Sequence, residues 1–230
     1  MLLDADDSQL VLVDYQARLM PLIFENEMIV ANALRLARMA RAMDVPVWGT
    51  EQNPDGLGRN TPELIAAIEA ASEAGGGRTL TKMHFNAVED GLADWLRPPV
   101  RKPAQGASQG ASQGGNARSL PRHLQKPAAP AVPDMPEGRN TIVIAGCEAH
   151  VCLMQTALGL LEEEFEVWVV TDACSSRSER NRDAAFDRLA GAGAELVTTE
   201  MVAFEWLRTA EHPAFREMLA LVKQGDALKK

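Results

Sequence analysis

The residue in this chain best suited to nucleophilic chemistry is Cys152, in the segment TIVIAGCEAHVCLMQT. The apolar run over 141–145 predicts a buried strand, Gly146 is expected to end it, and apolar residues at helical spacing predict a helix over 150–163. Cys152 would then lie in the first turn of that helix, where unpaired N–H groups and the helix dipole favour a thiolate over a thiol. The alternative is that Cys152, like Cys147, is a small buried core residue.

Two charged residues follow other predicted strands. Asp14 ends the apolar run QLVLVD, and Lys82 ends RTLTK. In an open parallel α/β sheet the active site lies beyond the carboxyl ends of the strands, where the strand order reverses. The strand over 141–145 begins the second half of the chain, so we expect it to flank that point beside the first strand, and Asp14, Lys82 and Cys152 to meet there. Taken singly, Asp14 could cap the next segment and Lys82 could be a solvated charge.

A carboxylate, an ammonium and a thiol at one sheet edge permit nucleophilic catalysis. Asp14 would take the proton of Cys152, directly or within an ion pair, while Lys82 keeps the carboxylate ionised and stabilises the thiolate. The thiolate would attack a carbonyl-type carbon, and backbone N–H groups of the turn over 146–152 would hold the oxyanion. After a leaving group such as ammonia departs, water would hydrolyse the thioester.

Strands and helices alternate along the chain, which is typical of a parallel sheet covered on both faces. The patterns predict strands over 9–14, 45–50, 78–82, 141–145, 165–171 and 195–198. They predict helices over 26–43, 61–71, 88–96, 150–163, 179–189, 199–207 and 213–224, and a loop over 51–60. We therefore expect a three-layer α/β/α fold with a six-stranded, mostly parallel, Rossmann-like sheet, formed by residues 1–230 as a single domain.

The segment over 98–139 has a different composition. It contains QGAS twice, followed by a run rich in proline and alanine. Such a segment offers little apolar periodicity to offset its ordering entropy. We expect a disordered low-complexity insertion between the third and fourth strands. A lid or a partner-binding tether is the functional alternative to a tolerated loop expansion.

Net charge and cysteine content limit the kinds of partner and the cellular compartment that are expected. The net charge of −9 argues against a nucleic-acid or anionic-membrane surface. Three cysteines without framework spacing indicate reduced thiols and a cytoplasmic protein. The acidic N-terminus does not fit a signal peptide, and no apolar run has the length of a membrane span.

Three blocks together carry a family resemblance: LVLVDYQ, TKMHF and AGCEAHVCLMQTA. They resemble the isochorismatase-like cysteine hydrolases, which include nicotinamidase and N-carbamoylsarcosine amidohydrolase. The resemblance extends from Leu10 to Trp206, apart from the insertion. The segments TEQNPDGLG, VVTDACSSR and TTEMVAFEWL also resemble a branch of largely uncharacterised hydrolases in that superfamily.

The resemblance implies roles for individual residues. Asp14, Lys82 and Cys152 would form the catalytic triad, and the backbone N–H groups of Glu148 and Cys152 would form the oxyanion hole. It also implies a cis peptide bond between Cys147 and Glu148. Cys147 would then be structural, and Cys174 a bystander.

The chain departs from the nicotinamidase pattern in its metal ligands. Nicotinamidases bind a metal through an Asp/His cluster after the second strand, whereas the loop over 51–60 contains no histidine. The four histidines lack ligand spacing. We therefore expect no metal and no cofactor. Isochorismatase itself cleaves a vinyl ether without needing the cysteine, so Cys152 favours hydrolysis of a small amide or related C–N bond.

Four residues close in sequence to the triad are candidates for binding a small-molecule substrate: Gln16, His84, Phe85 and His150. Ordinary packing is an equally weighted interpretation for both histidines.

Two other classes of function stay open. One is a catalytically silent interaction protein that keeps the fold. The other is a redox or acyl-transfer protein that uses Cys147 and Cys152 as a pair, although their C-x4-C spacing is not the C-x-x-C of redox motifs. We also expect a homo-oligomer, with MVAFEWL and FREMLALV as interface segments. The alternative is that both segments simply cover the sheet.

Overall fold

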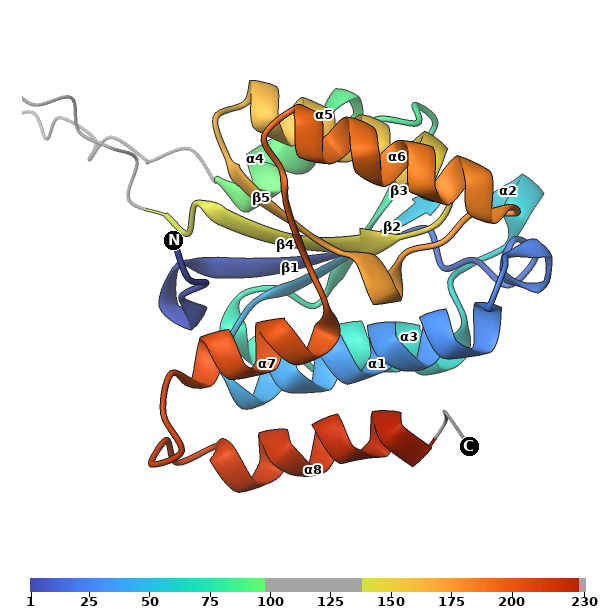
Figure 1. Ribbon diagram of the computed structural model, residues 1–230. Coiled ribbons are helices and arrows are strands. Elements are labelled where there is room, and N and C mark those ends of the chain that lie inside the picture. Colours follow the sequence, from blue (N-terminus) through green and yellow to red (C-terminus); the bar gives the residue numbers. More distant parts are fainter. Residues whose placement is uncertain (98–137, 228–230) are drawn as a thin grey trace, which may run out of the picture.

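A six-stranded sheet forms the centre of the molecule (Figure 1). The computed structural model describes residues 1–97 and 138–227. The strands are β1 (Ser8–Val13), β2 (Val47–Gln52), β3 (Arg78–Lys82), β4 (Thr141–Gly146), β5 (Glu166–Val170) and β6 (Glu195–Val197). Every residue of β1, β2 and β4 is buried, as expected for central strands that helices cover on both faces.

The strand order is β3-β2-β1-β4-β5-β6, and every neighbouring pair is parallel. The order reverses between β1 and β4, which are neighbours, with Val13 opposite Gly146 at their carboxyl ends. This arrangement confirms the predicted Rossmann-like sheet and the predicted pairing of the first and fourth strands.

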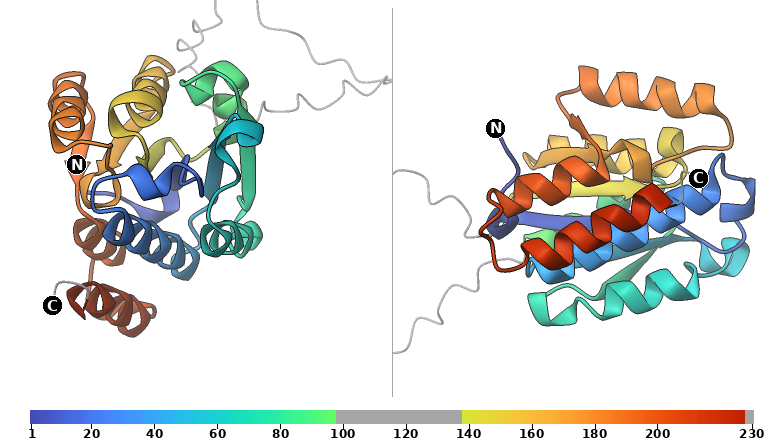
Figure 2. Two further views of the ribbon diagram at one scale, coloured as in Figure 1. Left: turned by 90° about the vertical axis from the view of Figure 1, so that its right-hand side faces the viewer. Right: turned by 60° about the horizontal axis from the view of Figure 1, so that its bottom comes forward.

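Helices cover both faces of the sheet in two layers (Figures 1 and 2). One face carries α1 (Asn26–Ala42), α3 (Pro62–Glu69) and α7 (Thr199–Leu207), and the other carries α4 (Leu92–Leu96), α5 (Met154–Glu162) and α6 (Glu179–Gly191). The short helix α2 is Pro54–Leu57. Single helical turns are η1 (Ala5–Asp7), η2 (Met20–Leu22), η3 (Ser72–Ala74), η4 (Ala87–Asp90), the π-helical η6 (Ala149–Leu153) and η7 (Thr171–Ala173). The predicted three-layer fold is confirmed.

The last helix, α8 (Phe215–Ala227), lies outside these layers and packs on α1 (Figure 1). Its Met218 and Leu221 are buried. Helix α7 buries Val202 and Trp206, whereas its Phe204 is exposed. The two segments expected to form a subunit interface therefore bury most of their apolar surface against other parts of the same chain. In the part of the chain that the structure describes, no helix combines the length and apolarity needed to cross a membrane.

Several predicted element ends differ from the structure, and three of these differences concern elements that carry or border the site. Strand β2 continues through Gln52, so the predicted loop over 51–60 begins later and contains α2. The helix predicted over 88–96 is divided into η4 and α4 by Gly91, whose φ of 91° is left-handed. Gly146 is the last residue of β4, whereas the pattern predicted that the strand would stop before it.

The predicted insertion over 98–139 lies outside the described residues, apart from its last two. Of these, Arg139 donates hydrogen bonds to the carbonyls of Ala5 and Ser8. The Gln9 side chain donates to the carbonyls of both Leu96 and Arg139. Both flanks of the insertion are therefore anchored at the amino-terminal edge of the sheet, away from the carboxyl ends of the strands.

Candidate active site

The three residues predicted to act together meet at the carboxyl edge of the sheet. Asp14 directly follows β1, Lys82 ends β3, and Cys152 lies in η6, after β4. Asp14 has a left-handed φ of 54°, and its amide donates to the Thr50 carbonyl at 3.2 Å. Aspartate tolerates this conformation better than most residues. The site therefore forms beside the reversal of strand order, where parallel α/β sheets bind their ligands.

Asp14 and Lys82 form a fully buried ion pair, with Lys82 Nζ 2.8 Å from Asp14 Oδ2. The strands that carry them are not neighbours, because β2 lies between β1 and β3. Two strand spacings amount to roughly 9–10 Å, and the long lysine side chain spans β2 to reach the carboxylate. A buried ion pair is favourable only when further hydrogen bonds satisfy its remaining donors and acceptors.

Residues of the intervening strand supply those hydrogen bonds. Thr50 Oγ1 donates to Asp14 Oδ1 at 2.6 Å, and Lys82 Nζ donates to Gln52 Oε1 at 2.7 Å. Thr50 and Gln52 are two positions apart, so the strand places them on the same face. The sequence analysis missed both residues. The period-2 pattern would have found them if the strand had been extended to Gln52.

Burial is the largest influence on the pKa of the Cys152 thiol in the free protein. The pKa of this thiol is raised to about 12, mostly by burial and also by the Asp14 carboxylate, whereas the Lys82 ammonium lowers it. Both charges therefore act on the thiol. The expectation of a thiolate stabilised by the helix dipole is therefore wrong for the free protein, because loss of hydration outweighs the dipole. The site therefore combines the Cys152 thiol with the Asp14–Lys82 ion pair.

The turn that carries Cys152 is fixed by backbone contacts on both sides. The peptide bond between Cys147 and Glu148 is cis, as predicted. The Cys147 amide donates to the Val13 carbonyl at 3.0 Å, and the Ala149 amide donates to the Ser175 carbonyl at 2.8 Å. The turn is thus tied to β1 and to the segment after η7.

The π-helical turn leaves two amides free of the partners they would otherwise have. The Glu148 carbonyl accepts from the amides of Val151 and Leu153, and not from that of Cys152. The Glu148 amide donates to no acceptor among residues 1–97 and 138–227. Backbone N–H groups in this turn are thus able to receive a developing oxyanion.

Gln16 is buried, and its side chain holds the loop after β2. Its Nε2 donates to the carbonyls of Gln52, at 2.9 Å, and Gly58, and its Oε1 accepts from the Gln52 amide at 2.9 Å. These bonds occupy the amide group on both sides. The structure therefore places this candidate substrate ligand in a supporting position.

The side chains of His84 and Phe85 lie away from the buried ion pair. The His84 ring contacts Asp90 at 3.2 Å and is mostly exposed, and about half of Phe85 is exposed. Only their backbone carbonyls approach Lys82 Nζ, each at 3.4 Å. This loop therefore contributes carbonyl groups to the buried pair and its side chains to the surface.

His150 belongs to a polar cluster on the other side of the site. Its Nδ1 lies 2.9 Å from Ser176 Oγ, and its Nε2 lies 3.3 Å from Asn181 Nδ2. Arg177 Nε donates to Glu148 Oε2 at 2.9 Å, and the same carboxylate oxygen lies 3.9 Å from His150. The segment VVTDACSSR resembles the family, but its sequence alone does not indicate these contacts.

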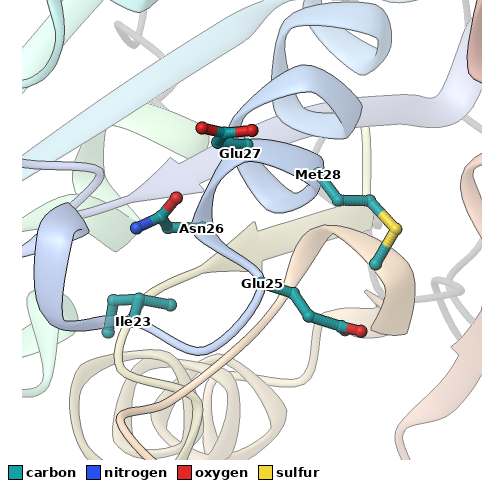
Figure 3. A pocket seen from close by; sticks show the side chains of 5 residues that line it. All are labelled: Ile23, Glu25, Asn26, Glu27 and Met28. Atoms are coloured by element: carbon teal, nitrogen blue, oxygen red, sulfur yellow. The ribbon is translucent and has the colours of Figure 1, made fainter. Parts of the chain in front are cut away.

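Two surface cavities lie among loops and helix ends. One, of about 380 Å³, lies at the start of α1 and is lined by Ile23, Glu25, Asn26, Glu27 and Met28 (Figure 3). It adjoins Phe24, whose amide donates to the Ser176 carbonyl. The other, of about 520 Å³, is lined mainly by the loop after β3 and by α5: Met83, His84, Phe85, Asn86, Glu89, Gln155, Leu158, Gly159 and Glu162. The exposed side chains of His84 and Phe85 thus face a cavity next to the site.

The remaining cysteines do not form an alternative centre. All three cysteines are free, and burial raises the pKa of both Cys147 and Cys174 above the ordinary thiol value. Within the described residues, no group of three or more His, Cys, Asp or Glu side chains is arranged to hold a metal ion.

Comparisons with known proteins agree on one domain family. The family model of the isochorismatase domain matches residues 8–102 and 136–201. Isochorismatase domain-containing protein 2 of Rattus norvegicus is 32% identical over 219 residues, which cover 95% of this chain and 82% of the relative. Its Xenopus laevis namesake is 32% identical over 217 residues, covering 94% and 84%.

Solved structures show the same similarity. The structure of MAR1 ribonuclease from Caenorhabditis elegans has a TM-score of 0.70 and 26% identity, covering 97% of this chain and 93% of that one. The YcaC gene product of Escherichia coli, described as an octameric hydrolase of unknown specificity, has a TM-score of 0.67 and 26% identity, covering 99% and 98%.

Proposed function

Because this chain belongs to the isochorismatase family, whose fold supports a hydrolase, we propose that it is a cofactor-independent cysteine hydrolase of small molecules. The bond cleaved is an amide or a related C–N bond. The observation that carries this proposal is the buried Asp14–Lys82 ion pair, whose two charges both act on the Cys152 thiol.

The first step transfers the thiol proton. Because the pKa of Cys152 is raised to about 12, the thiol is protonated at neutral pH and needs a base at the moment of attack. Asp14 accepts the proton within its ion pair with Lys82, and the sulfur forms a bond to the carbonyl carbon. The ammonium of Lys82 favours this step because it stabilises the negative charge that develops on sulfur.

The carbonyl oxygen becomes an oxyanion in the same step. The N–H groups of Glu148 and Cys152 are the proposed donors, since the Cys152 amide does not donate to the Glu148 carbonyl and the Glu148 amide has no acceptor among the described residues. When the tetrahedral intermediate collapses, the C–N bond breaks and the amine leaves with the proton held by Asp14. Water then attacks the thioester, with Asp14 as base, and releases the acid and the free thiol.

We propose that side chains at the edges of the site recognise the substrate. We assign contact roles to His84 and Phe85, which line the cavity beside the loop after β3, and to His150 on the opposite side. Gln16 acts indirectly, through the loop that it holds.

Two competing functions have distinct signatures. The Caenorhabditis elegans neighbour is called a ribonuclease, so RNA belongs among the substrates tested. The net charge of −9 disfavours RNA binding here, because binding depends on neutralising phosphates. A catalytically silent interaction protein would turn over no substrate at all.

The test is a panel of small primary amides, N-carbamoyl compounds, esters and single-stranded RNA, with wild type, Cys152→Ala and Cys174→Ala. Ammonia release and RNA integrity report turnover, and intact mass after acid quenching reports an acyl adduct. We expect amide turnover and an adduct mapped to Cys152 in wild type and Cys174→Ala, and neither in Cys152→Ala. Turnover that survives Cys152→Ala, or cleavage of RNA alone, contradicts the proposal.

A further inference from the structure

Gln52 is a buried polar residue whose side chain is used at both ends. Its Oε1 accepts a hydrogen bond from Lys82 Nζ at 2.7 Å, and its Nε2 donates to the Met83 carbonyl at 2.8 Å. Gln52 and Lys82 are also opposite each other in the register of β2 and β3. The side chain therefore connects the end of the lysine with the backbone of the residue that follows it.

The backbone of Gln52 is held as firmly as its side chain. Gln16 accepts from the Gln52 amide and donates to its carbonyl, both at 2.9 Å. The next residue, Asn53, donates its amide to the Lys82 carbonyl at 2.9 Å. Because both ends of Gln52 are fixed, its side-chain oxygen is a rigid acceptor at the tip of Lys82.

An ammonium group has three N–H donors. Asp14 and Gln52 are the two short acceptors of the Lys82 ammonium, at 2.8 and 2.7 Å. Two backbone carbonyls of the loop after β3 lie farther off, at 3.4 Å. Because two of its acceptors are short and fixed, rotation of the Lys82 ammonium is restricted and its charge is held in one place.

We propose that Gln52 is a positioning residue of the active site, whose side-chain carbonyl holds the Lys82 ammonium where its charge acts on both Asp14 and Cys152. This inference rests on the proposed function, since it assigns Gln52 a part in activating the proposed nucleophile. Gln52 itself acts only through Lys82.

The neutral charge of the amide is part of this role. A carboxylate at the same place would accept from Lys82 equally well, but it would compete with Asp14 for the ammonium and add a negative charge near the sulfur. Negative charge near a thiol raises its pKa. An amide orients the ammonium and leaves its charge available to Asp14 and Cys152.

The experiment measures the second-order rate constant for alkylation of Cys152 by iodoacetamide from pH 7 to pH 10.5, with peptide mapping. The variants are Gln52→Leu and Gln52→Glu. The matched control is Gln9→Leu, because Gln9 is also a buried strand glutamine with three side-chain hydrogen bonds, but at the amino-terminal edge. Thermal unfolding of each variant reports its stability.

We expect Gln52→Leu to alkylate about tenfold more slowly than wild type at each pH, because the fraction of thiolate falls tenfold when the thiol pKa rises by about one. Gln52→Glu should react more slowly still, although it is closer in shape to glutamine. Gln9→Leu should lose comparable stability and react within about twofold of wild type.

The outcomes separate this inference from the proposed function. If Gln52→Leu reacts like wild type, or if Gln52→Glu keeps more reactivity than Gln52→Leu, Gln52 is merely structural and the inference is wrong. If Cys152 of the native wild type is not alkylated at any pH in this range, or no faster than Cys147 and Cys174, the nucleophile assignment fails, and the proposed function fails with it. If Gln52→Leu does not fold, the comparison of Gln52→Glu with wild type decides.

Discussion

The Cys152 thiol lies between two opposite charges, and removing either charge changes its pKa in a known direction. Asp14 raises this pKa and Lys82 lowers it. Asp14→Asn should therefore lower the thiol pKa, and alkylation at pH 8 should become about tenfold faster each time that pKa falls by one. The same change should slow amide hydrolysis by a factor of about 10²–10⁴, since the base is lost. Lys82→Met should slow both reactions.

The pH profile of iodoacetamide labelling checks the first expectation. With a pKa of about 12 in the wild type, the labelling rate should rise roughly tenfold for each increase of one in pH between pH 7 and pH 10. Cys174→Ala should leave the profile unchanged. Slower labelling of Asp14→Asn would contradict the argument, because it would mean that the carboxylate already activates the thiol in the free protein. Asp14→Asn and Lys82→Met each leave a buried charge unpaired, so the circular dichroism of these two variants must first match that of wild type.

Thr50 and Thr141 offer a matched pair at opposite edges of the sheet. Each is buried and donates its hydroxyl to an aspartate, Thr50 to Asp14 at 2.6 Å and Thr141 to Asp7 at 2.7 Å. Replacement of either by valine should lower the free energy of unfolding by about 1.5–3 kcal/mol, as for other hydrogen bonds to charged groups. Only Thr50→Val should also slow hydrolysis, because it frees the Asp14 carboxylate to rotate.

Urea unfolding and turnover of the best panel substrate measure the two effects. Equal losses of turnover in both variants would mean that the loss follows stability and not the orientation of Asp14.

At this scale the sequence indicated which residue types meet, but not what surrounds them. Asp14, Lys82 and Cys152 are each marked by a strand end, which a pattern of apolar runs can locate. The protonation state of Cys152 depends on how much of it is buried, and a linear pattern does not contain that quantity. Gln16 was predicted to bind substrate because it is close to Asp14 in sequence. Its side chain instead donates hydrogen bonds to carbonyls of Gln52 and Gly58, at the end of β2 and in the loop after it.

Among the elements, β1 and β4 come closest where the site begins, and Gly146 allows this approach. A Cβ at Gly146 would lie 2.5 Å from both the Cβ and the carbonyl oxygen of Val13. Gly146→Ala should therefore push β4 away from β1 and lower the free energy of unfolding by about 1–3 kcal/mol, as overpacking does. Gly191→Ala, at the end of α6 with no atom within 4 Å of the added Cβ, should be neutral or stabilising by about 0.5–1 kcal/mol.

Urea unfolding of both variants checks this prediction, and Cys152 labelling shows whether the displacement reaches the site. Gly146→Ala with wild-type stability would mean that the two strands separate at little cost.

The elements also show where sequence patterns lose resolution. The helix over 199–207 and the strand over 78–82 were predicted to the residue, because each is bounded by strong turn or capping signals. The end of β2 was placed two residues early, since Glu51 and Gln52 are polar although both are buried. Buried polar residues near a functional site break the apolar pattern on which the prediction depends.

For the whole molecule, alternation of strands and helices was sufficient to predict the fold. Right-handed crossovers and a buried parallel sheet leave few arrangements of six such units. The cavity beside the loop after β3 could not be predicted in this way. It is formed by segments that lie far apart in sequence, residues 83–89 and α5.

Oligomerisation is the remaining prediction for the whole molecule, and the outer face of α7 is where we place the contact. Met201 and Phe204 are exposed and three residues apart, so they share one face of the helix. Light scattering should give a mass that is a multiple of 24.9 kDa, since exposed apolar side chains that share one face are typical of interaction sites. Phe204→Glu should reduce this mass, because a buried carboxylate without a partner is costly.

The competing surface is the exposed pair Met83 and Phe85 beside the site, so Phe85→Glu is the comparison. If Phe85→Glu dissociates the assembly and Phe204→Glu does not, the subunits meet beside the catalytic residues and the α7 assignment is wrong. Loss of hydrolysis together with dissociation would then indicate that a neighbouring subunit completes the cavity next to Lys82. A wild-type mass of 24.9 kDa would remove both interfaces and leave the site to a single chain.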